Sequence, residues 1–153
     1  MIAPDYNATA VHADYWINPQ IGTDAALALA MAQVIVEENL YKEDYVREQT
    51  DLAILVRDDT HRYLRGADLS ATGGKDVLQF WDETSDQLAV VPGCEGEGST
   101  SLALGSLRPA LTGRREVTLA DGKTVGVRPL FDVLRAHLDN GYRPEQAAKV
   151  TGV

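Results

Sequence analysis

The sequence predicts an α/β protein, and three observations support this fold class. The chain has 153 residues, of which 44% are hydrophobic and 24% are charged, and such a length and composition are ordinary for one globular domain. Residues 25–36 contain no charged side chain, which indicates an apolar helix. Residues 77–91 and 115–129 each place apolar runs on both sides of a polar turn, a pattern typical of β-hairpins.

The first part of the chain is expected to be extended and then helical. Residues 1–19 predict the end of a short strand, a turn, and a second extended piece at residues 15–17. A helix should follow and end near Asn39, where the chain becomes polar again. Because a wholly apolar helix is normally buried, we expect this helix to enter the core.

The next segments alternate between helix and loop signals. Residues 42–49 predict a second helix with Tyr45 and Val46 facing inward and charged residues facing outward. Residues 92–106 hold four glycines and one proline without any periodicity, which predicts a flexible loop.

The last third of the chain has clear turn and helix-end signals. Asp121 and Gly122 form a dipeptide that favours a tight hairpin turn. Residues 130–138 then predict a helix with a stop at Gly141, and a final helix should begin at Pro144 and end at Gly152.

Charge and hydropathy exclude several classes of partner. The chain has 14 Lys and Arg against 23 Asp and Glu, a net charge of −9, and its basic residues are scattered. We therefore expect no binding to nucleic acid or to anionic membranes. The longest uncharged run is far shorter than the roughly 20 residues that span a bilayer. No signal peptide pattern is present at the N-terminus, so the sequence as it stands predicts a cytoplasmic, soluble chain.

Metal-binding and catalytic residues are not indicated by the sequence. His12, His61 and His137 are isolated, and none has a second ligand at helical or hairpin spacing. Cys94 is the single cysteine and has no basic neighbour in sequence that would activate it. We predict no metal ligands and no catalytic residues in this chain.

Gly22, Thr23 and Asp24, here called the 22–24 corner, offer the best candidate site. The first turn of a helix presents free N–H groups that favour an anion or a polar ligand edge. A carboxylate can also accept two parallel hydrogen bonds, as from the N1–H and exocyclic amine of guanine. The alternative is that Thr23 or Asp24 simply caps the helix, an interaction worth about 1 kcal/mol. Spacing alone favours the cap.

A resemblance to a known family covers nearly the whole chain. It is carried by the linked segments IAPDYNATAVHADYWINPQIGTDAALALAMAQVIVEENLYKEDYVREQTDL, LVRDDTHRYLRGADL, FWDETS, EVTLADGKTVGVRPLFDVLRAHL and YRPEQAAKVTGV. These segments resemble the molybdopterin oxidoreductases of the dimethyl sulfoxide reductase family. The longer middle segment is similar to the subgroup that holds respiratory nitrate reductase and ethylbenzene dehydrogenase.

The resemblance implies a cofactor-binding role. It places the chain in a partial Rossmann-like domain, with β-hairpin insertions, that holds one molybdopterin guanine dinucleotide in a much longer catalytic subunit. Gly22, Thr23 and Asp24 then match the corner that contacts guanine, and Asp5 matches an acid that binds ribose hydroxyls. The iron–sulfur cysteines and the molybdenum ligand of the family lie outside the matched residues.

The resemblance also sets expectations about partners. Residues 1–153 should form a single partial domain that packs against the remaining domains of its parent, which could be cytoplasmic or periplasmic. We expect this chain alone to be inactive and to bind no cofactor. An exposed strand edge near the N-terminus would favour a homo-oligomer. The alternative function is a free-standing α/β protein-interaction module that retains the fold without the cofactor.

Overall fold

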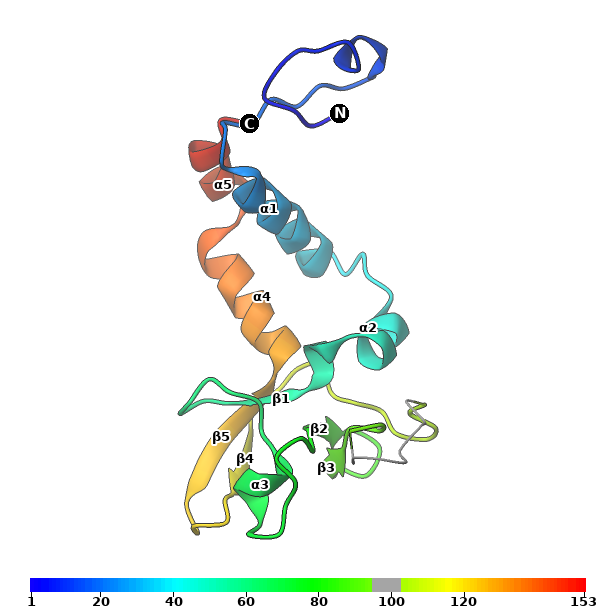
Figure 1. Cartoon of the computed structure of the whole chain (residues 1–153), viewed down its shortest axis with the longest axis vertical. Coiled ribbons are helices and arrows are strands. Elements are labelled where there is room, and N and C mark those ends of the chain that lie inside the picture. Colours follow the sequence, from blue (N-terminus) through cyan, green and yellow to red (C-terminus); the bar gives the residue numbers. More distant parts are fainter. Residues whose placement is uncertain (95–102) are drawn as a thin grey trace. The chain divides into compact units, whose positions relative to one another are not determined.

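The computed structural model describes residues 1–94 and 103–153 and divides the chain into two compact units (Figure 1). The helical unit comprises Met1–Tyr41 and Arg135–Val153, and the β unit comprises Lys42–Leu134. The mixed helix and sheet content confirms the predicted α/β class. That residues 1–153 form one partial domain of a larger enzyme stays a prediction.

The helical unit is built around α1 (Asp24–Glu37), which packs against α5 (Pro144–Thr151). Its irregular N-terminal segment includes the short helix η1 (Ala10–His12). In that segment Ile2 and Ile17 form a parallel bridge, and the Ala3 amide donates to the Ile17 carbonyl at 3.0 Å. The predicted strand end and extended piece are therefore paired with each other, although neither forms a full strand.

The signals predicted for the ends of the helices are present. Pro144 occupies the first turn of α5, and Gly152 closes the helix in the left-handed conformation, at φ 78°. Helix α1 ends at Glu37, two residues before Asn39, which has a positive φ of 55°. Helix α4 (Leu130–Gly141) ends at the predicted glycine.

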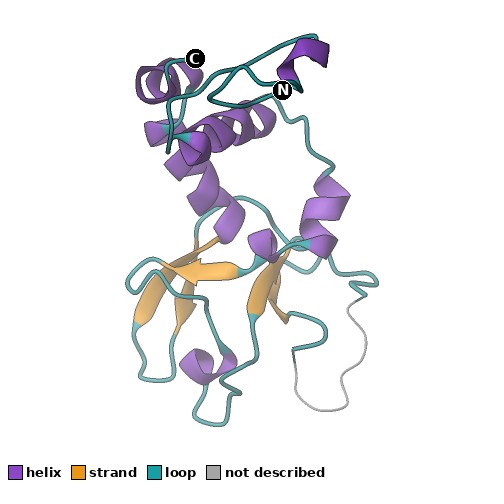
Figure 2. Cartoon of the chain, turned by 45° about the horizontal axis from the view of Figure 1, so that its top comes forward, coloured by secondary structure: helices purple, strands orange, loops and turns teal. Residues whose placement is uncertain are grey.

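The β unit contains both predicted hairpins (Figure 2). Its elements are α2 (Glu43–Gln49), η2 (Asp51–Ala53), β1 (Leu55–Arg57), α3 (Gly66–Leu69), β2 (Gln79–Asp82), β3 (Gln87–Val90), β4 (Arg115–Thr118) and β5 (Thr124–Pro129). Strands β2 and β3 form one antiparallel sheet, and the other sheet has the order β1-β5-β4, also antiparallel. The hairpins explain the β2–β3 and β4–β5 pairings, because each joins two consecutive strands by a short turn, whereas β1 and β5 pair across a long stretch of chain.

The two sheets, residues 92–106 and helix α2 each bear on an expectation from the sequence. Both sheets of the described residues are antiparallel, so the Rossmann-like arrangement stays a prediction. The predicted flexible loop at 92–106 lies partly outside the described residues, and its flexibility is untested. Tyr45 was predicted to face inward and is 61% exposed, whereas its neighbour Val46 is buried as expected. A helix as short as α2 can bury only a narrow stripe of side chains, and the buried residues of α2 are Val46 and Arg47.

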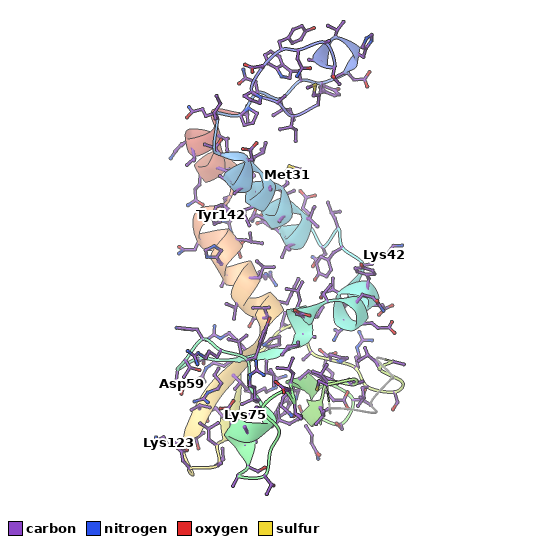
Figure 3. The ribbon with its side chains drawn as sticks, viewed as in Figure 1. Met31, Lys42, Asp59, Lys75, Lys123 and Tyr142 are labelled. Carbon is purple, nitrogen blue, oxygen red and sulfur yellow. The ribbon has the colours of Figure 1, made fainter. Side chains whose placement is uncertain are left out.

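The two units differ in their cores. In the β unit, five buried aliphatic side chains form one cluster: Leu55, Leu64, Val117, Leu119 and Val127. In contrast, helix α1 buries only Ala30 and Gln33, so the expectation that it lies wholly in a core is wrong for the described residues. Met31, which is labelled in Figure 3, is 50% exposed. None of the helices that the structure describes has the length and apolar character needed to cross a membrane.

Candidate functional site

A tight turn places the 22–24 corner at the start of α1. The Thr23 amide donates to the Gln20 carbonyl at 3.1 Å, which closes a four-residue β-turn. Gly22 is the third residue of this turn and has a φ of 84°, whereas Ile21 has no positive φ. This combination is the type II turn, which requires glycine at its third position. The turn therefore explains why residue 22 is a glycine, independently of any role in binding a ligand.

Thr23 stands at the N-cap position of α1 without acting as a side-chain cap. Its hydroxyl donates to the Gln20 carbonyl at 2.7 Å and so faces back into the turn. Its own carbonyl accepts the first hydrogen bond of the helix, from the Leu27 amide at 3.2 Å. The interpretation of Thr23 as a side-chain cap is therefore wrong, because the hydroxyl is turned toward the Gln20 carbonyl and accepts no hydrogen bond from the first turn of α1.

Asp24 is the first residue of α1 and is exposed. Its carboxylate makes no hydrogen bond or ion pair with any residue that the structure describes, so it does not cap the helix either. The backbone N–H groups of Asp24, Ala25 and Ala26 likewise have no partner among the described residues, as expected for a first turn. The corner thus presents a free acceptor pair next to free donors at the positive end of a 14-residue helix.

Asp5 lies in the N-terminal segment, beyond the bridge at Ile2. Its side chain is exposed and forms no hydrogen bond with the described residues. No hydrogen bond in the described part of the chain connects Asp5 to the 22–24 corner. The corner and Asp5 are both accessible, and a shared ligand for them stays a prediction.

Sequence reasoning missed the support of the corner. The backbone N–H of Gln20 donates to the backbone carbonyl of Thr151, at the end of α5, at 2.8 Å. Gln20 and Thr151 belong to no recognisable local pattern, and they are far apart in the sequence. Only the tertiary structure brings them together.

Asp58 is an example of the charged groups of the β unit that pair with one another. Asp58 accepts from the Arg128 guanidinium at 2.8 Å and from the Arg114 guanidinium at 2.7 Å. The hydrogen bond from Arg128, followed by that from Arg114, holds the pKa of Asp58 below its ordinary value. An acid that is already paired twice is a structural clamp between strands and is a poor candidate for chemistry.

Asp82 is a buried structural acid at the end of β2. Its carboxylate accepts from the Ser85 hydroxyl at 2.7 Å and from the backbone amide of Arg108 at 2.8 Å. These bonds, with that of the Ser85 hydroxyl largest, lower the pKa of Asp82 to about 2. Asp82 thereby fixes the hairpin turn to the segment before β4.

The remaining chemical candidates are also occupied or scattered. The Cys94 thiol donates to the Val91 carbonyl at 2.8 Å and its sulfur accepts from the Leu78 amide at 3.2 Å. Among the residues that the structure describes, no three His, Cys, Asp or Glu side chains gather as a metal site would require. A cavity of about 630 Å³ in the β unit is lined by Val56, Tyr63 and Leu130 among others.

Comparison with known proteins gives one consistent set of relatives, although no family model matches the chain. The chain is 43% identical to the perchlorate reductase subunit alpha of Dechloromonas aromatica, over 99% of this chain and 18% of the relative. It is 40% identical to the dimethylsulfide dehydrogenase subunit alpha of Rhodovulum sulfidophilum, over 99% of this chain and 16% of the relative. The respiratory nitrate reductase subunit alpha of Haloferax mediterranei is 38% identical, over 97% and 16%. The chain therefore spans less than a fifth of each relative.

Proposed function

We propose that this chain, which belongs to the molybdopterin oxidoreductases of the dimethyl sulfoxide reductase family, forms part of a cofactor pocket in a catalytic alpha subunit. Its relatives are alpha subunits of molybdenum oxidoreductases. In the proposed role, the 22–24 corner binds the guanine end of a molybdopterin guanine dinucleotide. When bound in the full-length subunit, that cofactor supplies the redox chemistry, and this segment supplies binding and orientation.

The single observation that carries the proposal is the Asp24 carboxylate at the start of α1, which has no partner in the part of the chain that the structure describes. Guanine presents the N1–H and the exocyclic amine side by side, and one carboxylate can accept both bonds. The neighbouring guanine O6 is an acceptor, which matches the free N–H groups of the first turn. Asp5, which is exposed, is the proposed partner of ribose hydroxyls.

The residues of this chain fit a binding role better than a catalytic one. The described residues include no metal-ligand cluster, and the buried acid of the β unit, Asp82, is fully engaged in structural bonds. We therefore propose that the chain is inactive alone and that guanine nucleotides bind it weakly or not at all, because the rest of the pocket would come from other domains.

Asp24→Asn in the full-length subunit tests the proposal. The amide would turn its NH₂ group toward two guanine donors and lose at least one hydrogen bond, at a cost of about 1 to 3 kcal/mol in cofactor binding. We expect lower cofactor content, and we expect the cofactor-free variant to melt at the same temperature as cofactor-free wild type, because bound cofactor itself raises the melting temperature. Asp44→Asn is the matched control, because Asp44 is also an exposed first-turn acid, in α2. Full cofactor content in Asp24→Asn would remove the proposed contact.

The alternative is a free-standing protein-interaction module. The observation that favours it is the exposure of large apolar side chains in the helical unit, such as Ile21 at 87% and Leu40 at 65%. An apolar surface of this kind is typical of association sites. The DNA that flanks the coding sequence separates the two functions: a reading frame that continues the family pattern on either side supports the enzyme segment, and an interruption supports the module.

A further inference from the structure

The 22–24 corner has one backbone hydrogen bond to an element that does not adjoin it. Within the described residues, the amide of Gln20 donates to the Thr151 carbonyl at 2.8 Å, and no other backbone bond ties residues 20–23 to a distant segment. The carboxylate of Asp24 and the first N–H groups of α1 make no hydrogen bond with residues 1–94 or 103–153. Their positions therefore depend on α1 itself and on the turn that precedes it.

The backbone of Gln20 links α5 to the start of α1 by hydrogen bonds on both sides. Its N–H bonds to Thr151, and its carbonyl accepts both the amide and the hydroxyl of Thr23, at 3.1 and 2.7 Å. Thr23 in turn accepts the first helical hydrogen bond of α1. Two consecutive links, from Thr151 to Gln20 and from Gln20 to Thr23, thus connect the end of α5 with the residue that precedes Asp24.

The end of α5 is well suited to serve as a fixed support. Thr151 is fully buried, and its hydroxyl donates to the Ala147 carbonyl at 3.0 Å. Gly152 closes the helix with a φ of 78°, and its amide donates to the Ala148 carbonyl at 2.8 Å. A Cβ atom on Gly152 would stand 3.5 Å from the side chain of Gln20, so an alanine there would be in van der Waals contact with the first residue of the turn.

Helix α5 also packs along α1. The turn before α1 and the body of α1 therefore take their positions from the same helix. We propose that Thr151 and Gly152 are positioning residues for the 22–24 corner, which hold Asp24 and the first-turn N–H groups in the geometry that receives a guanine edge. This proposal rests on the proposed function, because it assigns the support of that same site. Preorganisation of this kind raises affinity without any added ligand contact.

Gly152→Ala compared with Gly122→Ala provides the test. Both glycines have a left-handed φ, 78° and 84°, and Gly122 lies in the β4–β5 turn with open space around it. A non-glycine residue in this conformation shifts a local equilibrium by about five- to thirtyfold. We expect Gly152→Ala to accelerate deuterium exchange at the Gln20 and Thr23 amides of this chain by about fivefold or more. Gly122→Ala should leave these amides unchanged.

A second pair of variants guards against a global folding defect in Gly152→Ala. Thr151→Val removes the hydroxyl that bonds to Ala147, and Thr151→Ser keeps it. We expect faster Gln20 exchange in the valine variant and recovery in the serine variant. Equal exchange at Gln20 in wild type, Gly152→Ala and Thr151→Val would overturn the proposal.

The full-length subunit separates this proposal from the proposed function. We expect Gly152→Ala and Asp24→Asn both to lower cofactor content, while Gly122→Ala does not. If Asp24→Asn lowers the content and Gly152→Ala accelerates exchange without lowering it, the positioning role is wrong and the proposed function stands. If Asp24→Asn retains full cofactor content, the proposed function fails and the positioning role fails with it.

Discussion

The helical unit and the β unit differ in how much of their own apolar surface they cover. Large exposed apolar side chains are concentrated in the helical unit, although it is the shorter of the two; Tyr45 is the sole large apolar residue of the described β unit that is similarly exposed. The β unit closes its core around Leu55 and Val127, both fully buried.

Charge pairing follows the same division. Of the thirteen ion pairs in the described residues, eleven lie within the β unit, so its polar surface is organised by its own side chains. Helix α1 is apolar on every side and buries two residues. A helix of that kind requires contacts on several faces. The β unit therefore covers its own apolar core, whereas the helical unit leaves apolar side chains exposed, as expected if other domains of the proposed larger subunit cover them.

A leucine-to-alanine substitution in each unit should give the largest difference in the free energy of unfolding. Leu55→Ala removes a fully buried side chain from the core cluster and should lower the free energy of unfolding by about 2 to 5 kcal/mol. Leu40→Ala removes a side chain that is 65% exposed and should change it by less than about 0.5 kcal/mol. Urea denaturation measures both. Similar losses for the two variants would show that Leu40 is covered in solution, and the contrast between the units would be lost.

Acid should weaken the β unit through Asp82. Its hydrogen bonds with Ser85 and neighbouring amides lower the folded-state pKa to about 2, from an ordinary value of 3.8. A depressed folded-state pKa stabilises the protein above the unfolded value, and this contribution is lost as the pH falls from about 4 toward 2. We expect the urea midpoint of wild type to fall over this range and that of Ser85→Ala to fall less. An identical pH profile for the two proteins would exclude Asp82 as the responsible acid.

Gly126 tests the clamp on β5. A Cβ atom there would collide with the side chains of Asp58 and Arg114, which would have to separate. Because this pair is partly exposed, Gly126→Ala should cost only about 1 kcal/mol. Gly141→Ala is the control: the space around Gly141, the last residue of α4, is open, and alanine favours a helix. Thermal unfolding should show a lower melting temperature for Gly126→Ala alone.

The smallest effect on stability should come from the exposed apolar surface. Ile21→Glu changes a side chain that is 87% exposed, so unfolding should shift by less than about 0.5 kcal/mol. If the uncovered surface drives self-association, sedimentation should show dimers or larger species in wild type and fewer in the variant. A wild-type protein that is monomeric at high concentration would contradict the proposed association.

Sequence patterns predicted what depends on neighbouring residues. Asp121 and Gly122 set the β4–β5 turn locally, and Gly122 does adopt a positive φ of 84°. Pro144 and Gly152 likewise set the ends of α5. The side-chain cap was wrong because the Thr23 hydroxyl bonds to Gln20 instead, a competition that spacing cannot resolve.

Other features depend on contacts between distant residues. The burial of α1 could not be predicted, because an apolar pattern indicates that a helix can be buried but does not show which segment packs against it. The support of Gln20 by Thr151 is a contact between backbone groups, which leaves no trace in side-chain identity. The candidate site therefore stays a prediction from the sequence, whereas the backbone bond that supports it is visible only in the structure.

The hydrogen bond between Gln20 and Thr151 has a consequence for the order of events during synthesis. The donor leaves the ribosome long before its acceptor, because Thr151 follows both hairpins and α4 in the chain. During translation, α1 can form while the turn before it still lacks its anchor. A nascent chain that stops before α5 carries Gly22, Thr23 and Asp24 without their support. The hydrogen bond that supports the 22–24 corner can therefore form only after α5 has been synthesised.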